Sequence, residues 1–280
     1  MKSLFFISTI FIVFLSGARA SAADSNTEAQ LRQTYVGSQR LLRHFYDAAT
    51  LTFDSDGNPT NKGKEGPWTL WGDVIIEDLH LKSSKLEMHG HRNMLVIDDQ
   101  NKKLRAIKLG KDFYIEIELK AGADQSIQLP AALERVFVPS ADLATAVPNY
   151  WQDYTARLTG KQLAGKPCGD SKPGNEVTLP EGATAKTRVS VEVVDGLKIH
   201  DVTPLYPLEA RKARVQGQVM VQAKIDKSGT IGQFCILQAI GAGLDDSAMD
   251  AIRQWKYRPY VFRGEPWEVE TTIKVQFALH

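Results

Sequence analysis

The alternating stretch near the end of the chain is the feature that most constrains the fold. Apolar and polar residues alternate without interruption between Trp267 and Leu279. One side would carry Val269, Thr271, Ile273, Val275, Phe277 and Leu279. The other side would carry Glu268, Glu270, Thr272, Lys274, Gln276 and Ala278. A period of two is typical of a half-buried β-strand. At a sheet edge, such a strand offers its open main-chain groups to another chain.

The length and the net charge of the chain are typical of a soluble globular protein. The 280 residues suit one large or two ordinary domains. The formal net charge is only +1, so we expect no nucleic-acid partner.

The first 23 residues predict a secretory signal peptide. Met1-Lys2 is positive, Leu4 to Leu15 is apolar, and Ala18-Arg19-Ala20 supplies small residues at a cleavage position, with Ala23 as a second option. The apolar run is shorter than the roughly 20 residues that span a bilayer. We therefore expect export, with an uncleaved inner-membrane anchor as the alternative.

The rest of the chain divides into three segments. Residues 24–160 predict a β-rich antiparallel domain with flanking helices, and 161–188 are rich in Gly and Pro, as linkers are. The expected helices are Ala29 to Phe45, Pro130 to Val138 and Asp142 to Leu158, and strands begin at Trp68 and continue to Leu119.

The third segment, residues 189–280, predicts a small domain of its own. A helix from Leu208 to Val215 precedes strands at Val219 to Ile225 and Ile231 to Ala239. A second helix around Leu244 to Trp255, with acidic residues in its first turn, leads to the terminal strand. The order predicts an α+β fold, with two helices on an antiparallel three-stranded sheet.

Few residues suggest a metal-binding or catalytic site. His89-Gly90-His91 places two imidazoles on one strand face, but a histidine pair without further ligands is a weak metal signal. Asp54 to Asn58 reads as a turn rather than a calcium loop. We predict no catalytic residue, cofactor or metal; an enzyme with its site in the N-terminal domain is the less favoured alternative. Cys168 and Cys235 are either disulfide-bonded or free.

The C-terminal residues resemble a known family. Tyr206-Pro207, Ala210-Arg211, Gly217, Gly229, Gly243-Leu244-Asp245, Trp255-x-Tyr257-x-Pro259, Gly264-x-Pro266 and Val275-x-Phe277 occur in the order found in TonB C-terminal domains. The resemblance covers about residues 200–280.

The resemblance implies a periplasmic protein that binds a short segment of an outer-membrane transporter by adding it to the terminal strand. It implies a partner-binding set on that strand and in the Tyr-Pro loop. The set is Tyr206, Pro207, Arg211, Glu268, Glu270, Thr272, Lys274 and Gln276.

The sequence differs from the full family pattern, because a signal peptide and a folded domain stand where a membrane helix and a Pro-rich spacer are expected. Inner-membrane motor proteins are implied as partners only if the N-terminus is retained. The main alternative is an envelope structural or assembly module without energy coupling; self-association through the terminal strand is a further one.

Overall fold

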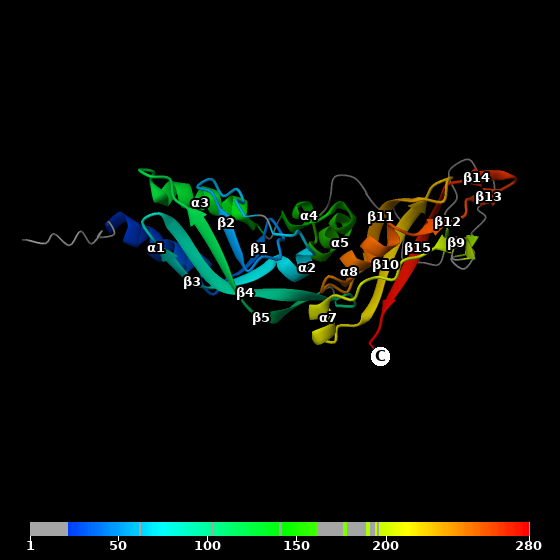
Figure 1. Ribbon diagram of the computed structural model, residues 1–280, viewed down its shortest axis with the longest axis horizontal. Coiled ribbons are helices and arrows are strands. Elements are labelled where there is room, and N and C mark those ends of the chain that lie inside the picture. The colour runs from blue at the N-terminus through cyan, green and yellow to red at the C-terminus, as the bar shows by residue number, and fades with distance from the viewer. Residues whose placement is uncertain are drawn as a thin grey trace, which may run out of the picture.

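The computed structural model describes residues 22–61, 63–101, 103–139, 142–161, 176–177, 189–190, 194 and 196–279. The predicted signal peptide and linker therefore lie mostly outside the described residues. The molecule is elongated, with a large sheet towards one end and a smaller sheet towards the other (Figure 1). The predicted α+β class is confirmed.

The N-terminal part is built on a six-stranded sheet. Its strands are β1 (Gln39–Leu42), β2 (Thr50–Phe53), β3 (Asp73–Leu81), β4 (Lys85–Asp98), β5 (Lys103–Glu118) and β6 (Phe137–Val138), in the order β2-β5-β4-β3-β1-β6. The central β3-β4-β5 strands form the predicted antiparallel meander. The edge strand β2 instead runs parallel to β5, so the sheet is mixed.

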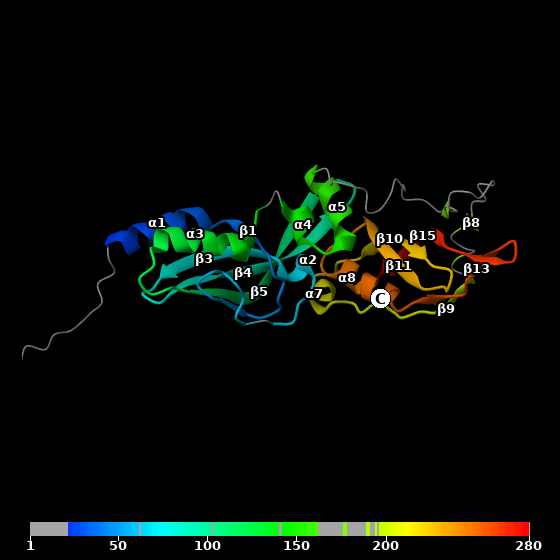
Figure 2. The ribbon, with the colours of Figure 1, turned by 90° about the horizontal axis from the view of Figure 1, so that it is seen from above.

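Helices α1 (Ala22–Tyr35) and α3 (Gln125–Val136) lie together over one face of this sheet (Figure 2). Leu129 and Leu133 from α3 are fully buried in the same apolar cluster as Ile76 and Phe113. The alternating residues Phe113, Ile115 and Ile117 all face this core, because a period of two places them on one side of β5.

Three local predictions in the N-terminal part are wrong. The helix expected from Pro130 to Val138 begins at Gln125 and ends at Val136, because Phe137 and Val138 form β6. The first helix ends at Tyr35 rather than Phe45, because Gly37 adopts a left-handed conformation (φ 76°) and the chain then enters β1. Trp68–Trp71 forms a helical turn, α2, rather than a strand. The turn follows Pro67 and buries Trp68, Thr69 and Leu70 together, which an alternating strand would separate.

Helices α4 (Leu143–Ala146) and α5 (Asn149–Thr159) occupy the middle of the molecule, near the predicted positions. Trp151 of α5 is fully buried and meets the Trp68 ring edge-on, with 5.3 Å between ring centroids. Their cluster also contains Ile236 and Ala239, which lie far along the chain. The middle helices therefore bridge the two sheets.

The C-terminal part contains the predicted helices and three-stranded antiparallel sheet. Its elements are β9 (Lys198–His200), α7 (Leu208–Lys212), β10 (Gly217–Ile225), β11 (Ile231–Gln238), α8 (Leu244–Ile252), β12 (Lys256–Tyr257), β13 (Tyr260–Phe262), β14 (Glu265–Trp267) and β15 (Val269–Phe277). The sheet order is β11-β10-β15. Helix α7 is shorter than predicted, and Trp267 belongs to β14 rather than to the terminal strand. A separate ribbon pairs β7 (Glu176–Val177) with β8 (Val189–Ser190).

The two sheets are joined by main-chain contacts. Val96 and Gly241 form an isolated antiparallel bridge, the Ile97 amide donates to the Ile240 carbonyl at 2.8 Å, and the Ala242 amide donates to the Leu95 carbonyl at 2.7 Å. One residue later, the Gly243 amide donates to Thr69 Oγ1 at 2.9 Å. This junction, from Ile240 to Gly243, fixes the start of α8 against the N-terminal part.

The junction leads to a stability prediction at Gly241. It has φ 81°, and a Cβ there would lie 2.3 Å from the Leu95 carbonyl oxygen. We expect Gly241→Ala to lower the free energy of unfolding by about 2 kcal/mol or more, because it combines backbone strain with a main-chain clash. Chemical denaturation measures the loss.

Gly232→Ala on β11 is the matched control, because nothing lies within 4 Å of an added Cβ there. Its effect should stay within about 0.5 kcal/mol. Equal stabilities for the two variants would contradict the role given to the junction.

Candidate functional site

The terminal strand β15 is the outer strand of its sheet in the described part of the chain. It pairs antiparallel with β10 along its whole length, from Ile225 opposite Val269 to Gly217 opposite Phe277. Five residues of the predicted inward face, Val269, Thr271, Ile273, Val275 and Phe277, are buried as expected. The sixth, Leu279, lies beyond the end of β15 and is half-buried. The short strand β7 lies close to β15 without joining its sheet.

The outward face of β15 is less uniform than the alternation predicts. Lys274 and Gln276 are exposed, as is Glu268 just before the strand. Thr272 is only 5% exposed and stands opposite Gln222, which is 6% exposed. Glu270 is half-buried and accepts a hydrogen bond from Gln222 Nε2. Alternation assigns a side chain to a face but does not reveal what covers that face.

The Tyr-Pro loop lies beside the C-terminal end of β15. The Tyr206 ring meets Phe277 edge-on, with 5.5 Å between ring centroids, and its hydroxyl donates to the Val215 carbonyl. The Arg211 guanidinium lies 5.7 Å from the centre of the Tyr206 ring. Burial raises the pKa of Tyr206, so it remains a neutral hydrogen-bond donor.

The residues of the predicted partner-binding set therefore do not lie together, because they are spread between the two ends of β15 and a pocket. Tyr206 packs on Phe277 at the C-terminal end of β15, with Arg211 over its ring, and Gln276 at the same end donates to the Gly217 carbonyl at 3.1 Å. Glu268 precedes the opposite end of the strand, about 27 Å from Gln276 at the usual rise per residue. Pro207 precedes α7 and also lines a pocket on the side facing the N-terminal part.

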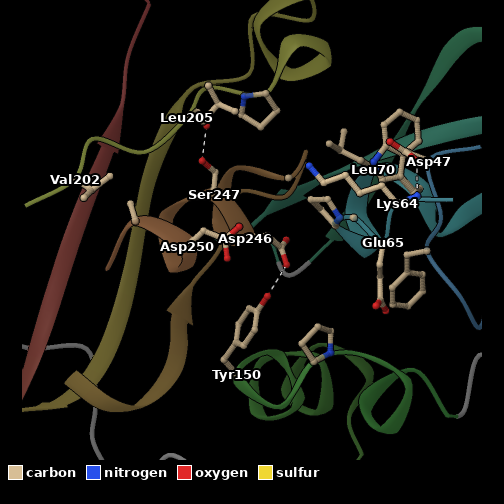
Figure 3. A pocket seen from close by; sticks show the side chains of 18 of the residues that line it. Asp47, Lys64, Glu65, Leu70, Tyr150, Val202, Leu205, Asp246, Ser247 and Asp250 are labelled. Carbon is tan, nitrogen blue, oxygen red and sulfur yellow. Dashed lines mark hydrogen bonds between the residues drawn. The ribbon is translucent and has the colours of Figure 1, made fainter. Parts of the chain in front are cut away.

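This pocket has a volume of about 730 Å³ and lies between the two parts of the molecule (Figure 3). Its walls come from residues 64–71, the start of α5, residues 202–207 and α8. Apolar side chains such as Phe45, Leu70, Trp71 and Leu205 share the lining with four carboxylates and one ammonium group. These charged residues are Asp47, Glu65, Asp246, Asp250 and Lys64.

Asp246 is the buried polar group of this pocket. Its Oδ1 accepts hydrogen bonds from the Tyr150 hydroxyl at 2.8 Å and from Trp151 Nε1 at 3.3 Å. Its Oδ2 is buried without a hydrogen-bond partner among the described residues. The pKa of Asp246 is raised to about 6: burial is the largest cause, the two hydrogen bonds oppose it, and the Asp250 carboxylate adds to the rise. Burial and the Asp246 charge likewise raise the pKa of Tyr150.

Sequence reasoning missed this pocket. It placed Asp245 and Asp246 at a helix start, where acidic residues are common, and treated Tyr150 only as part of a helix. The sequence did contain one signal, which is a pair of adjacent acidic residues in an otherwise apolar helix. In the structure both are buried, which is unusual for aspartate.

The side chains of the two metal sites considered from the sequence, at His89–His91 and at Asp54–Asn58, interact with nearby protein groups. His91 Nδ1 lies 2.6 Å from Glu77 Oε1, and the His89 ring packs against Tyr114 at 4.9 Å. Asp54 Oδ1 accepts from the Asp56 and Asn58 amides, which confirms the predicted turn. Across the described ranges, no three His, Cys, Asp or Glu residues are arranged to hold a metal ion.

Two further observations concern cysteines and helices. Cys235 on β11 is disulfide-bonded, and the other cysteine of the chain, Cys168, lies outside the described residues. None of the helices in the described ranges is both long and apolar enough to cross a membrane.

The C-terminal part thus defines a small α+β domain with its terminal strand at the sheet edge. Residues 202–279 match the family model described as Gram-negative bacterial TonB protein C-terminal. This segment belongs to the TonB C-terminal domain family, as its residues indicated.

Curated relatives include the protein TonB of Vibrio cholerae serotype O1, which is 32% identical over 110 residues, covering 38% of this chain and 45% of the relative. The protein TonB of Xanthomonas campestris pv. campestris is 32% identical over 78 residues, covering 28% of this chain and 35% of the relative. The chain therefore spans less than half the length of these relatives.

Similar solved structures include the Pseudomonas aeruginosa TonB C-terminal domain, with 22% identity and a TM-score of 0.26, covering 29% of this chain and 84% of that one. Another is the TonB2 protein of Vibrio anguillarum, with 22% identity and a TM-score of 0.25, covering 42% of this chain and 96% of that one.

The contacts of Tyr206 give a test of how the loop is held. Tyr206→Phe removes only the hydrogen bond to the Val215 carbonyl, so we expect it to cost about 1 kcal/mol of unfolding free energy. Tyr206→Ala also removes the packing on Phe277 and should cost about 2 kcal/mol or more. Urea denaturation of both variants measures the two costs.

The exposed Lys212→Ala on α7 should leave the unfolding free energy within about 0.5 kcal/mol of the parent and serves as the control. If Tyr206→Ala were as mild as this control, the loop would not be anchored through Tyr206.

Proposed function

We propose that this protein is exported to the periplasm and binds a short segment of an outer-membrane transporter by strand addition to β15. The observation that carries this proposal is the position of β15 as the outer strand of a three-stranded sheet, paired along its whole length with β10. An outer strand has a second row of main-chain donors and acceptors that can pair with an incoming segment. Membership of residues 202–279 in the TonB C-terminal domain family supports the same assignment.

The C-terminal half of β15 is the part best suited to specificity. Main-chain pairing supplies affinity for almost any extended segment, and side chains next to the added strand select among segments. Lys274 and Gln276 are exposed there, and Tyr206 with Arg211 lies beside the same end. Glu270 and Thr272 are less accessible, so we expect them to contribute mainly to holding the sheet together.

A second candidate function is an interaction module in envelope assembly, without energy coupling. The observation that favours it is the junction, where Leu95 and Ile97 hydrogen-bond to Ala242 and Ile240. A domain fixed in this way to a folded neighbour is suited to holding two components at a set distance. Coupling to inner-membrane motor proteins would additionally require a retained N-terminal anchor.

Register-dependent cross-linking tests strand addition. Single cysteines at Lys274 and at Gln276 are combined with a series of single cysteines along the N-terminal segment of a transporter. Because residues two apart in a strand share a face, moving the cysteine from 274 to 276 should move the best cross-link by two residues along the segment. Mass spectrometry of the cross-linked species identifies each pair.

Lys227→Cys, in the exposed turn between β10 and β11, is the matched control and should form no register-dependent cross-link. Cross-links that do not shift, or that form equally well at Lys227→Cys, would rule out strand addition at β15. Specific capture of another envelope protein, with no transporter cross-link, would favour the assembly module.

A further inference from the structure

The pocket between the two parts of the molecule is separate from the outer strand and has its own chemistry. Its volume of about 730 Å³ lies in the range of small-ligand sites. Figure 3 shows Asp246 near its centre, with Tyr150 on one side and Lys64 and Glu65 across from it. The lining therefore combines residues that only the folded arrangement of the N- and C-terminal parts brings together.

Asp246 is unusual among the groups that line this pocket. Asp246 lines the pocket and is only 8% exposed, and its Oδ2 is buried without a hydrogen-bond partner among the described residues. Both donors to its Oδ1, the Tyr150 hydroxyl and the Trp151 indole, are neutral. A buried carboxylate without a compensating charge is costly, and such groups concentrate at functional sites.

The remaining charges of the pocket favour a cation. Asp47 and Glu65 add two more carboxylates to the lining, against a single ammonium group from Lys64, and the third added carboxylate, Asp250, is ion-paired with Arg253 at 2.9 Å. Leu70, Trp71 and Leu205 provide apolar surface next to these acids, and Leu205 is 79% exposed at the rim. A group that is cationic at its tip and apolar along its stem would satisfy both features.

We propose that this pocket binds an ammonium or guanidinium group on an apolar stem, with the Asp246 carboxylate as its counter-charge. The basic side chain of an extended peptide and a free alkylamine share this chemistry. The pocket uses α5, α8 and residues 64–71, so the proposal does not depend on strand addition at β15.

Calorimetric titration of the full chain with three probes tests the proposal and identifies the source. The first probe is an end-capped pentapeptide with a central lysine flanked by leucines, the second replaces that lysine by norleucine, and the third is 1,5-diaminopentane. Binding of the lysine peptide but not of the diamine indicates a peptide side chain, and binding of the diamine indicates a free amine. Binding of neither cation, or equal binding of the norleucine peptide, overturns the proposal.

Asp246→Asn locates the bound cation. Asparagine keeps an oxygen to accept from Tyr150 and Trp151 and removes the negative charge. We expect the affinity for the cationic probe to fall about tenfold, with the melting temperature not lowered. Glu265→Gln, at the exposed first residue of β14, is the charge-matched control and should bind like the parent. Unchanged affinity in Asp246→Asn overturns the assignment.

A pH titration of the unmodified protein provides an independent measurement. The pKa of Asp246 is about 6, so the carboxylate gains its charge as the pH rises through this value, and cation affinity should increase between pH 5 and pH 7. The charged or titratable groups that face it are Asp245 and Asp250 from α8, Tyr150 from α5, Arg253 over the Tyr150 ring, and Asp47, Lys64 and Glu65 across the pocket.

Burial raises the pKa of Asp245 to about 8, so the change in charge of Asp245 is centred above this pH window. Affinity that stays constant from pH 5 to pH 7 contradicts the role of Asp246, whether or not the asparagine variant folds.

Discussion

The arrangement of the whole molecule depends on the junction between the two sheets. Asp245 accepts hydrogen bonds from the amides of Ile240 and Gly241, at 2.9 and 2.6 Å, and so fixes the loop that leads into α8. The same loop bonds through its main chain to Leu95 and Ile97 at the end of β4. Because the loop cannot move without breaking these bonds, α8 keeps one position relative to the N-terminal sheet.

The fixed position of α8 determines both the pocket between the two parts of the molecule and the placement of the outer strand β15. On the inner side, α8 carries Asp246 into contact with Tyr150 and Trp151 of α5, and the pocket forms around them. On the other side, the C-terminal sheet presents β15 as its outer strand. A flexible connection between the parts would preserve the strand but not the pocket, which needs side chains about one hundred residues apart to meet.

The sequence predicted local structure well where a period or a turn residue determined it. The alternation from Val269 to Phe277 placed the inward face of β15 correctly, and Pro148 correctly marked the start of α5. Trp68 to Trp71 was misassigned because three apolar residues and a threonine suit a strand and a helical turn equally. Only the packing of Trp68 on Trp151 distinguishes the two, and that contact depends on tertiary structure. Asp246 was missed for the same reason, since burial of a carboxylate depends on distant segments.

The central claim is that β15 pairs with an incoming strand, and hydrogen exchange of its amides tests this most directly. Exchange is followed by NMR for Val269 to Phe277, with and without a peptide taken from the N-terminal segment of an outer-membrane transporter. Strand addition predicts new protection at alternate amides, those that point away from β10, because successive amides of a strand point to opposite sides. No new protection along β15, or protection confined to other parts of the C-terminal domain, would contradict the claim.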